Sequence, residues 1–524
     1  MAGGFFATSS ENKLTEFKRR QIIHFFWALF LVTLPVTSFP YFPPAIGGEA
    51  LVRPLAVYPL IILVPLVLIP GLYKKPVPRV SLALFPILLV AGASSLLSLL
   101  RGIEPALGIS VDARVLRGMF TLIIGCVVYL TVSTLPEDPG DLRFSMQWIY
   151  AGCGIALAWS SLQVLYIVRF NSTFFEFLSG IQQHISTRRL LPDRISGLTY
   201  EPHWFADQMV LLLLPGLIAS SISGYSLFKW RWRWLSVERL GLCWVILVLP
   251  FTFSRAGLLN LLILLVVGMI LFGSLEKPLS DQALFMKSKR LRRQLAGTFF
   301  VLVIVILPII LAGAKNSFFS RIWQYWTREN TSLSGYITSL GFDARLAYSH
   351  AAYNTYKVHP FLGVGLGNYA FYLEEMLPYR PLAYIPEVLR VITPEYGRER
   401  LVTSKNFYLR LLAETGIVGL IVFMAFIVAH IGIALWLWLS PNNEQKFWGA
   451  MSLLGLTAFI LSAFTFDSFV IPNMWVVFGF ISAAYTVYKF PKVYGEETRM
   501  GSTIQADNLD FHILKPVDGG AVNE

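Results

Sequence analysis

Charged residues are scarce in this chain of 524 residues: 14% are Asp, Glu, Lys or Arg, whereas 55% are hydrophobic. A soluble protein carries about a quarter charged residues, so the composition excludes a soluble domain with an ordinary core. Several apolar runs reach about 20 residues without a charge, the length that an α-helix needs to cross a bilayer. The sequence therefore predicts an all-α, polytopic membrane protein.

Cysteine is scarce as well. The three cysteines, Cys126, Cys153 and Cys243, all lie inside apolar runs. Their spacing provides neither a disulfide framework nor a CxxC metal pair. We interpret them as small residues of the core.

Twelve apolar segments are candidate membrane spans. The segment at 239–253 is short and would need a thin or locally distorted bilayer. The first segment follows a cluster of basic residues, which is typical of a signal anchor with a cytoplasmic N-terminus. The candidate spans are 21–39, 55–73, 81–100, 115–135, 145–168, 204–222, 239–253, 256–273, 295–313, 412–438, 448–466 and 474–490.

Lysine and arginine are distributed unequally between the two sides of the predicted bundle. With the N-terminus inside, the cytoplasmic loops hold 19 of them, against nine in the outer loops before residue 314. Positive charge accumulates on the cytoplasmic side of membrane proteins, which favours cytoplasmic N- and C-termini. Because these charges set topology, we do not expect the net charge of +12 to bind nucleic acid.

This topology divides the chain into three parts. Residues 1–20 form a cytoplasmic N-terminus, and residues 21–490 form one membrane domain with extracytoplasmic loops at 169–203 and 314–406. The polar, aperiodic residues 491–524 are expected to be a disordered cytoplasmic tail.

The segment 314–406 is the most informative part of the sequence, because a long polar loop in a compact membrane protein usually carries a function. Asp343 is predicted to cap a helix that ends before Pro360. The following GVGLGN predicts a tight turn with positive φ rather than a dinucleotide site, since no strand precedes it. Asn406 is predicted to cap a helix that continues into the membrane.

Four cations from separate regions are expected on the outer side: Arg194, Arg255, Arg345 and Lys405. Arginine binds phosphate oxygens bidentately and stabilises the charge on a departing diphosphate. A cleft in which the four converge would therefore suit a lipid-linked diphosphate. Two structural roles remain open as alternatives to diphosphate binding. Lys405 could be an interfacial lysine, and Arg255 could form an ion pair with Glu414 or Asp467 near the span ends.

The aromatic residues of the long loop also allow two interpretations. They could stack on sugar rings, or they could form the core of the loop or an interfacial belt. These residues are Trp323, Tyr325, Trp326, Tyr348 and Tyr353.

Three segments carry a family resemblance: RISGLTYEP, FTFSRAGLL, and the stretch from Arg345 through VHPFLGVGLGN to SKNFYLRLLAETGIVGL. They resemble the O-antigen ligase and O-antigen polymerase group of bacterial membrane glycosyltransferases. The resemblance implies about twelve transmembrane helices of the class C type and catalysis without a metal or other cofactor. It also implies transfer of a glycan from undecaprenyl diphosphate to an acceptor hydroxyl, on lipid A–core for ligases and on another lipid-linked repeat for polymerases.

Carried over by motif, Arg194, Arg255 and Arg345 would bind the donor diphosphate. Ligases of the family have His before the Asn, whereas this chain has Lys405 before Asn406. A lysine is normally protonated at neutral pH, so we assign Lys405 to diphosphate contact and not to proton abstraction. The neighbouring Asn406 is assigned to the same contact.

The candidate catalytic residues are then Lys405, Glu201 and His203, the last two as general bases. His359 is interpreted as structural. The missing histidine favours a polymerase over a ligase.

The predicted function is polymerisation of undecaprenyl-diphosphate-linked repeats in a bacterial inner membrane, with the site facing the periplasm. The alternatives are an O-antigen ligase, a polysaccharide transporter or flippase, and a scaffold for polysaccharide assembly. A transporter would place ionisable groups and broken helices around the membrane midplane. The expected partners are the lipid-linked donor and acceptor, membrane lipids and a chain-length regulator.

Overall fold

The computed structural model describes residues 4–43, 51–74, 78–233, 235–274, 320–327, 331–333, 335–336, 340–377, 385–393 and 401–490. The described chain is helical apart from one antiparallel hairpin, β1 (Arg231–Trp232) and β2 (Leu235–Ser236), with Arg231 opposite Ser236. The expected helical class is therefore confirmed.

The longer helices form a bundle, and the shorter ones extend or connect them. The bundle contains α1 (Gly4–Thr33), α2 (Val57–Leu63), α3 (Ile69–Lys74), α4 (Leu84–Leu99), α5 (Val111–Thr134), α6 (Pro139–Val168), α8 (Pro202–Gln208), α9 (Leu214–Ser223), α10 (Val237–Val248), α11 (Arg255–Ser274), α19 (Phe407–Trp438), α20 (Asn443–Ser462) and α21 (Asn473–Lys489). The remaining elements are η2 (Val64–Leu68), η3 (Arg79–Ala83), α7 (Ser172–Gln182), η4 (Met209–Leu213), η5 (Leu249–Thr252), α13 (Arg321–Gln324), η6 (Tyr325–Thr327), α15 (Asp343–Val358), α16 (Tyr369–Tyr372) and α18 (Pro386–Ile392).

Helices overlap eleven of the twelve candidate spans, while the candidate at 295–313 and the tail at 491–524 lie outside the described residues. Among the described residues, six helical stretches are long and apolar enough to cross a membrane. The total of twelve spans stays a prediction. The six stretches are Arg79–Leu99, Val111–Thr134, Pro139–Val168, Pro202–Ser223, Arg255–Ser274 and Phe407–Trp438.

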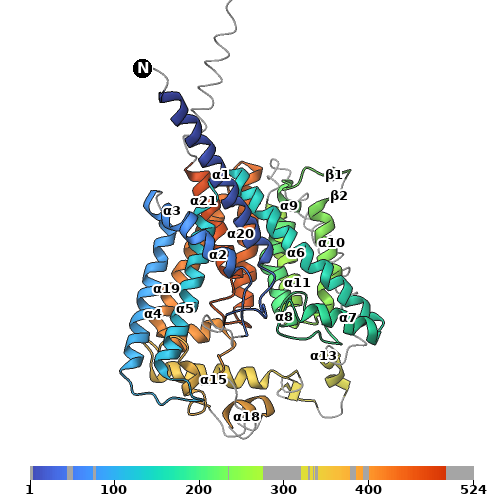
Figure 1. Ribbon diagram of the computed structural model, residues 1–524. Helices are drawn as coiled ribbons and strands as arrows, with labels where there is room; N and C mark the ends of the chain where they lie inside the picture. The colour runs from blue at the N-terminus through green and yellow to red at the C-terminus, as the bar shows by residue number, and fades with distance from the viewer. Residues whose placement is uncertain are drawn as a thin grey trace, which may run out of the picture.

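Helix α20 lies in the middle of the bundle and contacts α9, α11, α19 and α21 (Figure 1). Buried polar side chains join neighbouring helices: Ser482 Oγ lies 2.8 Å from the Tyr129 hydroxyl and 3.1 Å from His430 Nε2. Such hydrogen bonds hold α5, α19 and α21 together where the surroundings are otherwise apolar.

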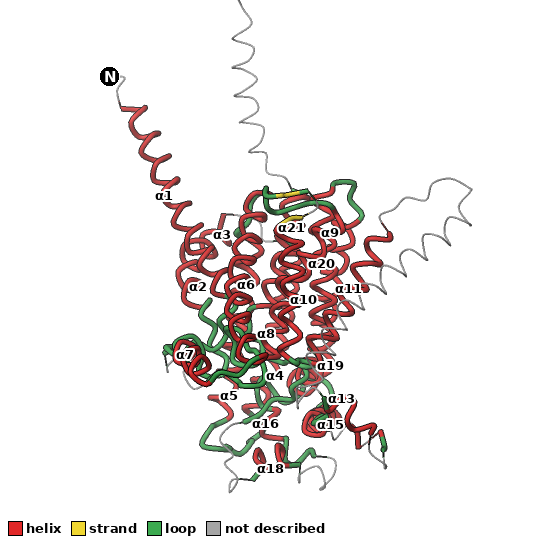
Figure 2. The backbone as a smooth tube through the Cα atoms, turned by 90° about the vertical axis from the view of Figure 1, so that its right-hand side faces the viewer, coloured by secondary structure: helices red, strands yellow, loops and turns green. Residues whose placement is uncertain are grey.

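Three short helices, α13, α15 and α18, form a layer at the end of the bundle opposite the N-terminus of α1 (Figures 1 and 2). This lower layer has its own small core, in which Ala347, Tyr348 and Ala351 of α15 pack against Tyr369 and Val388. The layer closes one end of the bundle and brings α15 beside α19.

The expected helix boundaries in this region are nearly correct. Asn406 caps α19, because its side-chain oxygen accepts a hydrogen bond from the Leu409 N–H at 3.1 Å. Helix α15 ends at Val358, two residues before Pro360, but Asp343 is its first residue rather than its cap. A carboxylate in the first turn still favours the helix, because it faces the positive end of the helix dipole.

The glycine turn at 359–368 fits into a break in α19. Gly363, Gly365 and Gly367 have φ values of +65°, +90° and +81°, which confirms the tight turn of positive φ. Gly416 breaks α19 with φ +66° and ψ −168°. A break frees backbone groups that would be costly to leave unpaired inside a membrane.

The turn supplies hydrogen-bond partners to the two peptide segments that flank the break. It donates to α19 at two carbonyls and accepts from it at two N–H groups. The bonds are Val364 N to Ala413 O at 2.9 Å, Gly365 N to Glu414 O at 2.9 Å, Ile417 N to Pro360 O at 2.8 Å and Val418 N to Phe361 O at 3.3 Å.

No side chain fits between the turn and the break. A Cβ atom on Gly363 would lie 2.4 Å from the carbonyl carbon of Glu414, and one on Gly416 would lie 2.1 Å from the Phe361 oxygen. Two arginines donate hydrogen bonds to carbonyls of the turn from the other side. Arg101 Nη1 donates to Gly363 O at 2.7 Å, and Arg114 Nε donates to Gly367 O at 2.9 Å. Glycine is therefore required both for φ and for space.

We expect Gly363→Ala to lower the free energy of unfolding by about 3 kcal/mol or more, because a clash with the α19 backbone adds to the cost of a positive φ. Gly102→Ala is the matched control, since Gly102 has φ +63° with nothing within 4 Å of the added carbon. This control should lose only about 1 kcal/mol. Thermal unfolding of both purified proteins in detergent measures the difference, and equal losses would contradict the clash.

Candidate functional site

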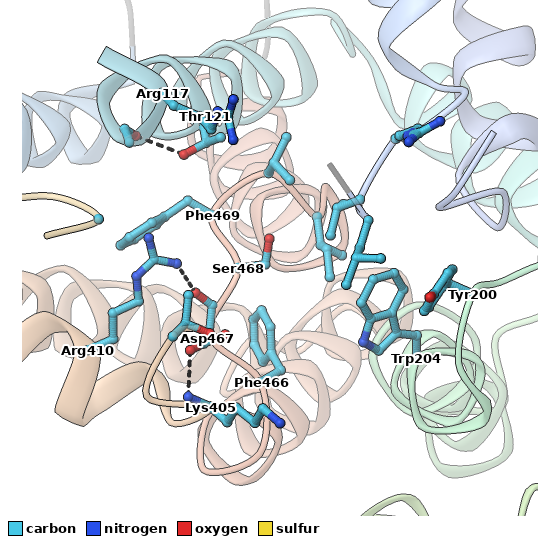
Figure 3. A pocket seen from close by; sticks show the side chains of 18 of the residues that line it. Arg117, Thr121, Tyr200, Trp204, Lys405, Arg410, Phe466, Asp467, Ser468 and Phe469 are labelled. Carbon is cyan, nitrogen blue, oxygen red and sulfur yellow. Dashed lines mark hydrogen bonds between the residues drawn. The ribbon is translucent and has the colours of Figure 1, made fainter. Parts of the chain in front are cut away.

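A cavity of about 940 Å³ is lined by residues from the bundle helices, their connecting segments and helix α15 of the lower layer. Its walls come from Phe42 and from residues within 51–57, 109–124, 200–204, 401–410 and 465–471, with Arg345 and Gly367. Figure 3 places Tyr200 and Trp204 on one side of it, with Arg117 and Arg410 across from them. Segments from both halves of the chain therefore meet at one site.

The charges that line the cavity are mainly positive. Among the described residues, its walls contain six cationic side chains and two carboxylates, which gives a formal net charge of +4. A cavity with this charge attracts anions strongly, because its low-dielectric walls focus the field. The cations are Arg53, Arg114, Arg117, Arg345, Lys405 and Arg410, and the carboxylates are Glu201 and Asp467.

Lys405 has an unusual backbone conformation just before the start of α19. Its φ is +55°, and its N–H donates to Asp467 Oδ2 at 2.7 Å (Figure 3). The ammonium donates to Glu387 Oε1 at 2.7 Å and lies 5.0 Å from the centre of the Tyr348 ring. Burial raises the pKa of Tyr348, so this ring stays a neutral surface beneath the cation.

Arg410, one turn into α19, is buried and makes three contacts. Its Nε donates to Glu414 at 3.0 Å, its Nη1 donates to the Asp467 carbonyl, and its guanidinium lies 4.9 Å from the centre of the Phe469 ring. The ion pair expected for Arg255 with one of these two acids is thus replaced by one between Arg410 and Glu414. The sequence carried the signal, since an i,i+4 spacing places the two side chains on one helix face.

Glu201 and His203 lie at the start of α8 and both line the cavity. The Glu201 carboxylate forms an ion pair with Arg188, whose guanidinium lies 5.2 Å from the centre of the Tyr200 ring. The positive charges of Arg345 and Lys405 act on the His203 ring. Four of the predicted site residues therefore do come together.

Arg194 lies just behind this group. It does not line the cavity, but its charge also acts on His203. Its Nε is 3.7 Å from Asp193 Oδ2. Burial lowers the pKa of Arg194, and the Asp193 carboxylate opposes this effect.

Arg255 lies elsewhere. It is the first residue of α11, and its Nη1 donates to the Leu340 carbonyl at 2.8 Å, with the guanidinium 5.9 Å from the centre of the Phe342 ring. It is not part of the cavity lining. In this structure Arg255 joins α11 to the segment before α15, so its predicted contact with a diphosphate stays a prediction.

Four cavity arginines, Arg53, Arg114, Arg117 and Arg410, were not among the predicted site residues. The first three were counted only among the outer charges that set topology. Their common signal was a position at the margin of an outer loop, where positive charge is less expected.

The aromatic residues of the loop differ in their surroundings. Tyr348 is fully buried in the core of the lower layer, and Tyr325 contacts Trp326 and Tyr336. Tyr353 is exposed. His359 belongs to the glycine turn, contacts the Tyr372 ring and has a pKa that is lowered by burial, which agrees with a structural role.

A family model described as O-antigen ligase matches residues 240–424. This segment is similar to the O-antigen ligase family. The expected resemblance is confirmed, and the O-antigen ligase segment contains α11, the glycine turn, Arg345 and Lys405. No match was found among curated proteins.

Arg194, Glu201 and His203 lie before the segment that matches the O-antigen ligase family. Within the described residues, no group of three or more His, Cys, Asp or Glu side chains is arranged to hold a metal ion.

We expect Arg410→Ala to lower the free energy of unfolding by about 3–5 kcal/mol, because Glu414 would stay buried without its counter-ion. The double variant Arg410→Ala/Glu414→Gln should recover part of this loss. Arg20→Ala, which removes an exposed partner of Asp138 and Asp141, is the control and should cost less than about 1 kcal/mol. Thermal unfolding measures all three, and a loss for Arg410→Ala no larger than for Arg20→Ala would count against the buried pair.

Proposed function

We propose that this chain polymerises undecaprenyl-diphosphate-linked oligosaccharide repeat units in bacterial surface polysaccharide biosynthesis. The observation that carries the proposal is the cavity of net charge +4, in which Arg345 and Lys405 lie beside His203. A diphosphate leaving group develops negative charge in the transition state, and fixed cations in a secluded site stabilise that charge. Similarity of the matched segment to the O-antigen ligase family supports glycosyl transfer as the reaction class.

In the proposed reaction, the acceptor hydroxyl attacks the anomeric carbon of the donor sugar. The bond between that carbon and the diphosphate oxygen breaks, and its electron pair leaves with the diphosphate. Arg345 and Lys405 bind the leaving group, and the resemblance implies inversion at the anomeric carbon. The hydroxyl proton passes to a general base on the cavity wall.

His203 is the better candidate for this base. Glu201 is already paired with Arg188, whereas a neutral imidazole has a lone pair that can accept a proton. Lys405 is bound to Glu387, which agrees with a cation that holds the diphosphate and not with a proton acceptor. Asn406 helps indirectly, because its cap fixes the start of α19 beside Lys405.

The proposed orientation places the site outside the cytoplasm. The cavity lies at the end of the bundle opposite the N-terminus of α1. With a cytoplasmic N-terminus, as the distribution of Lys and Arg favours, the cavity faces the periplasm. The lipid tail of the donor would remain in the bilayer.

An O-antigen ligase is the second candidate, and the description of the matching family model favours it. In that case the acceptor is lipid A–core. A transporter is less well supported, although α19 is broken at Gly416. The backbone groups beside this break bind the glycine turn, whereas in a transporter they would face the substrate.

We expect Arg345→Ala to abolish most glycan transfer in cells, because the leaving diphosphate loses a charge-assisted contact. Lys357→Ala is the control, since Lys357 lies on the same helix and is exposed. Gel ladders of surface glycan, at matched protein levels, provide the measurement. Unpolymerised repeats would support the polymerase, unattached long chains would support the ligase, and normal yield and chain length would contradict both.

We expect His203→Gln to lower kcat by about 10²-fold or more, the usual effect of removing a general base. Glu201→Gln should change kcat much less and should act mainly by releasing Arg188. Lys405→Arg should retain most activity, whereas Lys405→Gln should not, because the positive charge is what the diphosphate requires. Transfer assays with purified protein and a lipid-linked donor test the set, and a larger loss for Glu201→Gln than for His203→Gln would reverse the assignment.

A further inference from the structure

The cavity contains a second group of arginines, separate from Arg345 and Lys405. Arg114 and Arg117 lie one turn apart near the start of α5, and Arg410 lies across from them on α19. The charges of Arg117 and Arg410 both act on Arg114 and are repulsive. Arg410 is paired with Glu414, but Arg114 and Arg117 remain two like charges close together, which costs free energy unless an anion joins them.

The acids near this group are already engaged. Glu414 pairs with Arg410, and Asp467 accepts the hydrogen bond from the Lys405 N–H. Arg114 uses Nε for the Gly367 carbonyl. Within the part of the chain that the structure describes, Arg117 forms no hydrogen bond or ion pair, so its guanidinium is available to a ligand.

The two groups of cations act mainly on different residues. The largest charge effects on His203 come from Arg345 and Lys405, and the largest on Arg114 come from Arg410 and Glu414. In Figure 3, Arg117 lies across the cavity from Lys405 and Trp204, whereas Arg410 lies on the side of Lys405 and shares Asp467 with it.

We propose that Arg114 and Arg117 form a second anion subsite, which binds a phosphate or diphosphate group of the acceptor. The proposal rests on the function proposed above, in which Arg345 and Lys405 bind the donor. The anchored acceptor would extend its glycan across the cavity towards His203. Arg117 is then a residue that determines acceptor specificity, and acceptors without phosphate should be poor substrates.

Binding stoichiometry tests the subsite without turnover. The probe is undecaprenyl diphosphate added to the full-length protein in phosphatidylcholine nanodiscs. The wild type should bind two equivalents, and both Arg117→Glu and Arg345→Ala should bind one. Arg169→Glu is the control, because Arg169 is exposed, follows the end of α6 and lies outside the cavity lining. It should bind two.

The outcomes separate the two proposals. One equivalent in the wild type, lost in Arg345→Ala and retained in Arg117→Glu, would overturn the second subsite and leave the donor site intact. No binding by the wild type would overturn both. Displacement of the second equivalent by phosphatidylglycerol would show a general site for lipid headgroups and would also overturn the acceptor subsite.

Kinetics with different acceptors show whether the anion bound at the second subsite belongs to the acceptor. The wild type is given one donor with three acceptors: a lipid-diphosphate repeat, phosphorylated lipid A–core, and the same repeat on a neutral lipid. We expect Arg117→Glu to raise KM for the phosphorylated acceptor about tenfold or more, as the loss of a charge-assisted contact implies, with little change in KM for the donor. Equal use of the neutral acceptor by the wild type, or an unchanged acceptor KM in Arg117→Glu, would contradict the proposal.

Discussion

Backbone pairing between the glycine turn at 359–368 and the break in α19 at Gly416 fixes the geometry of the site. The break leaves peptide groups without helical partners, and the turn binds them from outside the helix. Both segments require glycine, because neither φ nor the available space admits a side chain. The pairing joins the lower layer to the bundle, where α15, which carries Arg345, contacts α19, whose first turn follows Lys405.

The contact between the glycine turn and α19 also positions the opposite wall of the cavity. Arg114 binds the carbonyl of Gly367, which places the start of α5 against the turn and leaves Arg117 one turn further along the helix. On the other side, Asp467 accepts the N–H of Lys405, and its carbonyl accepts from Arg410. Arg114 and Arg410 are thus held by backbone carbonyls of neighbouring segments, and Lys405 is held by the carboxylates of Asp467 and Glu387. Such fixed dipoles and charges need little reorganisation when an anion arrives, which is the property required for stabilising a leaving diphosphate.

Much of this arrangement could be predicted, for reasons that are local. Hydropathy located the helices because about 20 apolar residues are needed to cross a membrane. The cap at Asn406 and the positive φ of the turn follow from side-chain chemistry and from the lack of a Cβ. The cavity itself was only partly foreseen. Arg345 and Lys405 do meet beside His203, but Arg255 lies outside the lining and Arg117 was counted only among the charges that set topology. Convergence depends on how distant segments pack, and a single sequence without aligned relatives carries no direct signal for that.

The sequence alone determined the class of the protein, the positions of most helices, the glycine turn and the family resemblance, because each depends on residues close together in the chain. The tertiary structure decided which charges share a cavity and which partner each acid takes. Glu414 pairs with Arg410 and not with Arg255. Arg114 contacts a residue 253 positions away. Contacts over such separations arise from helix arrangement and from the need to pair buried backbone groups, and neither is encoded in a local pattern.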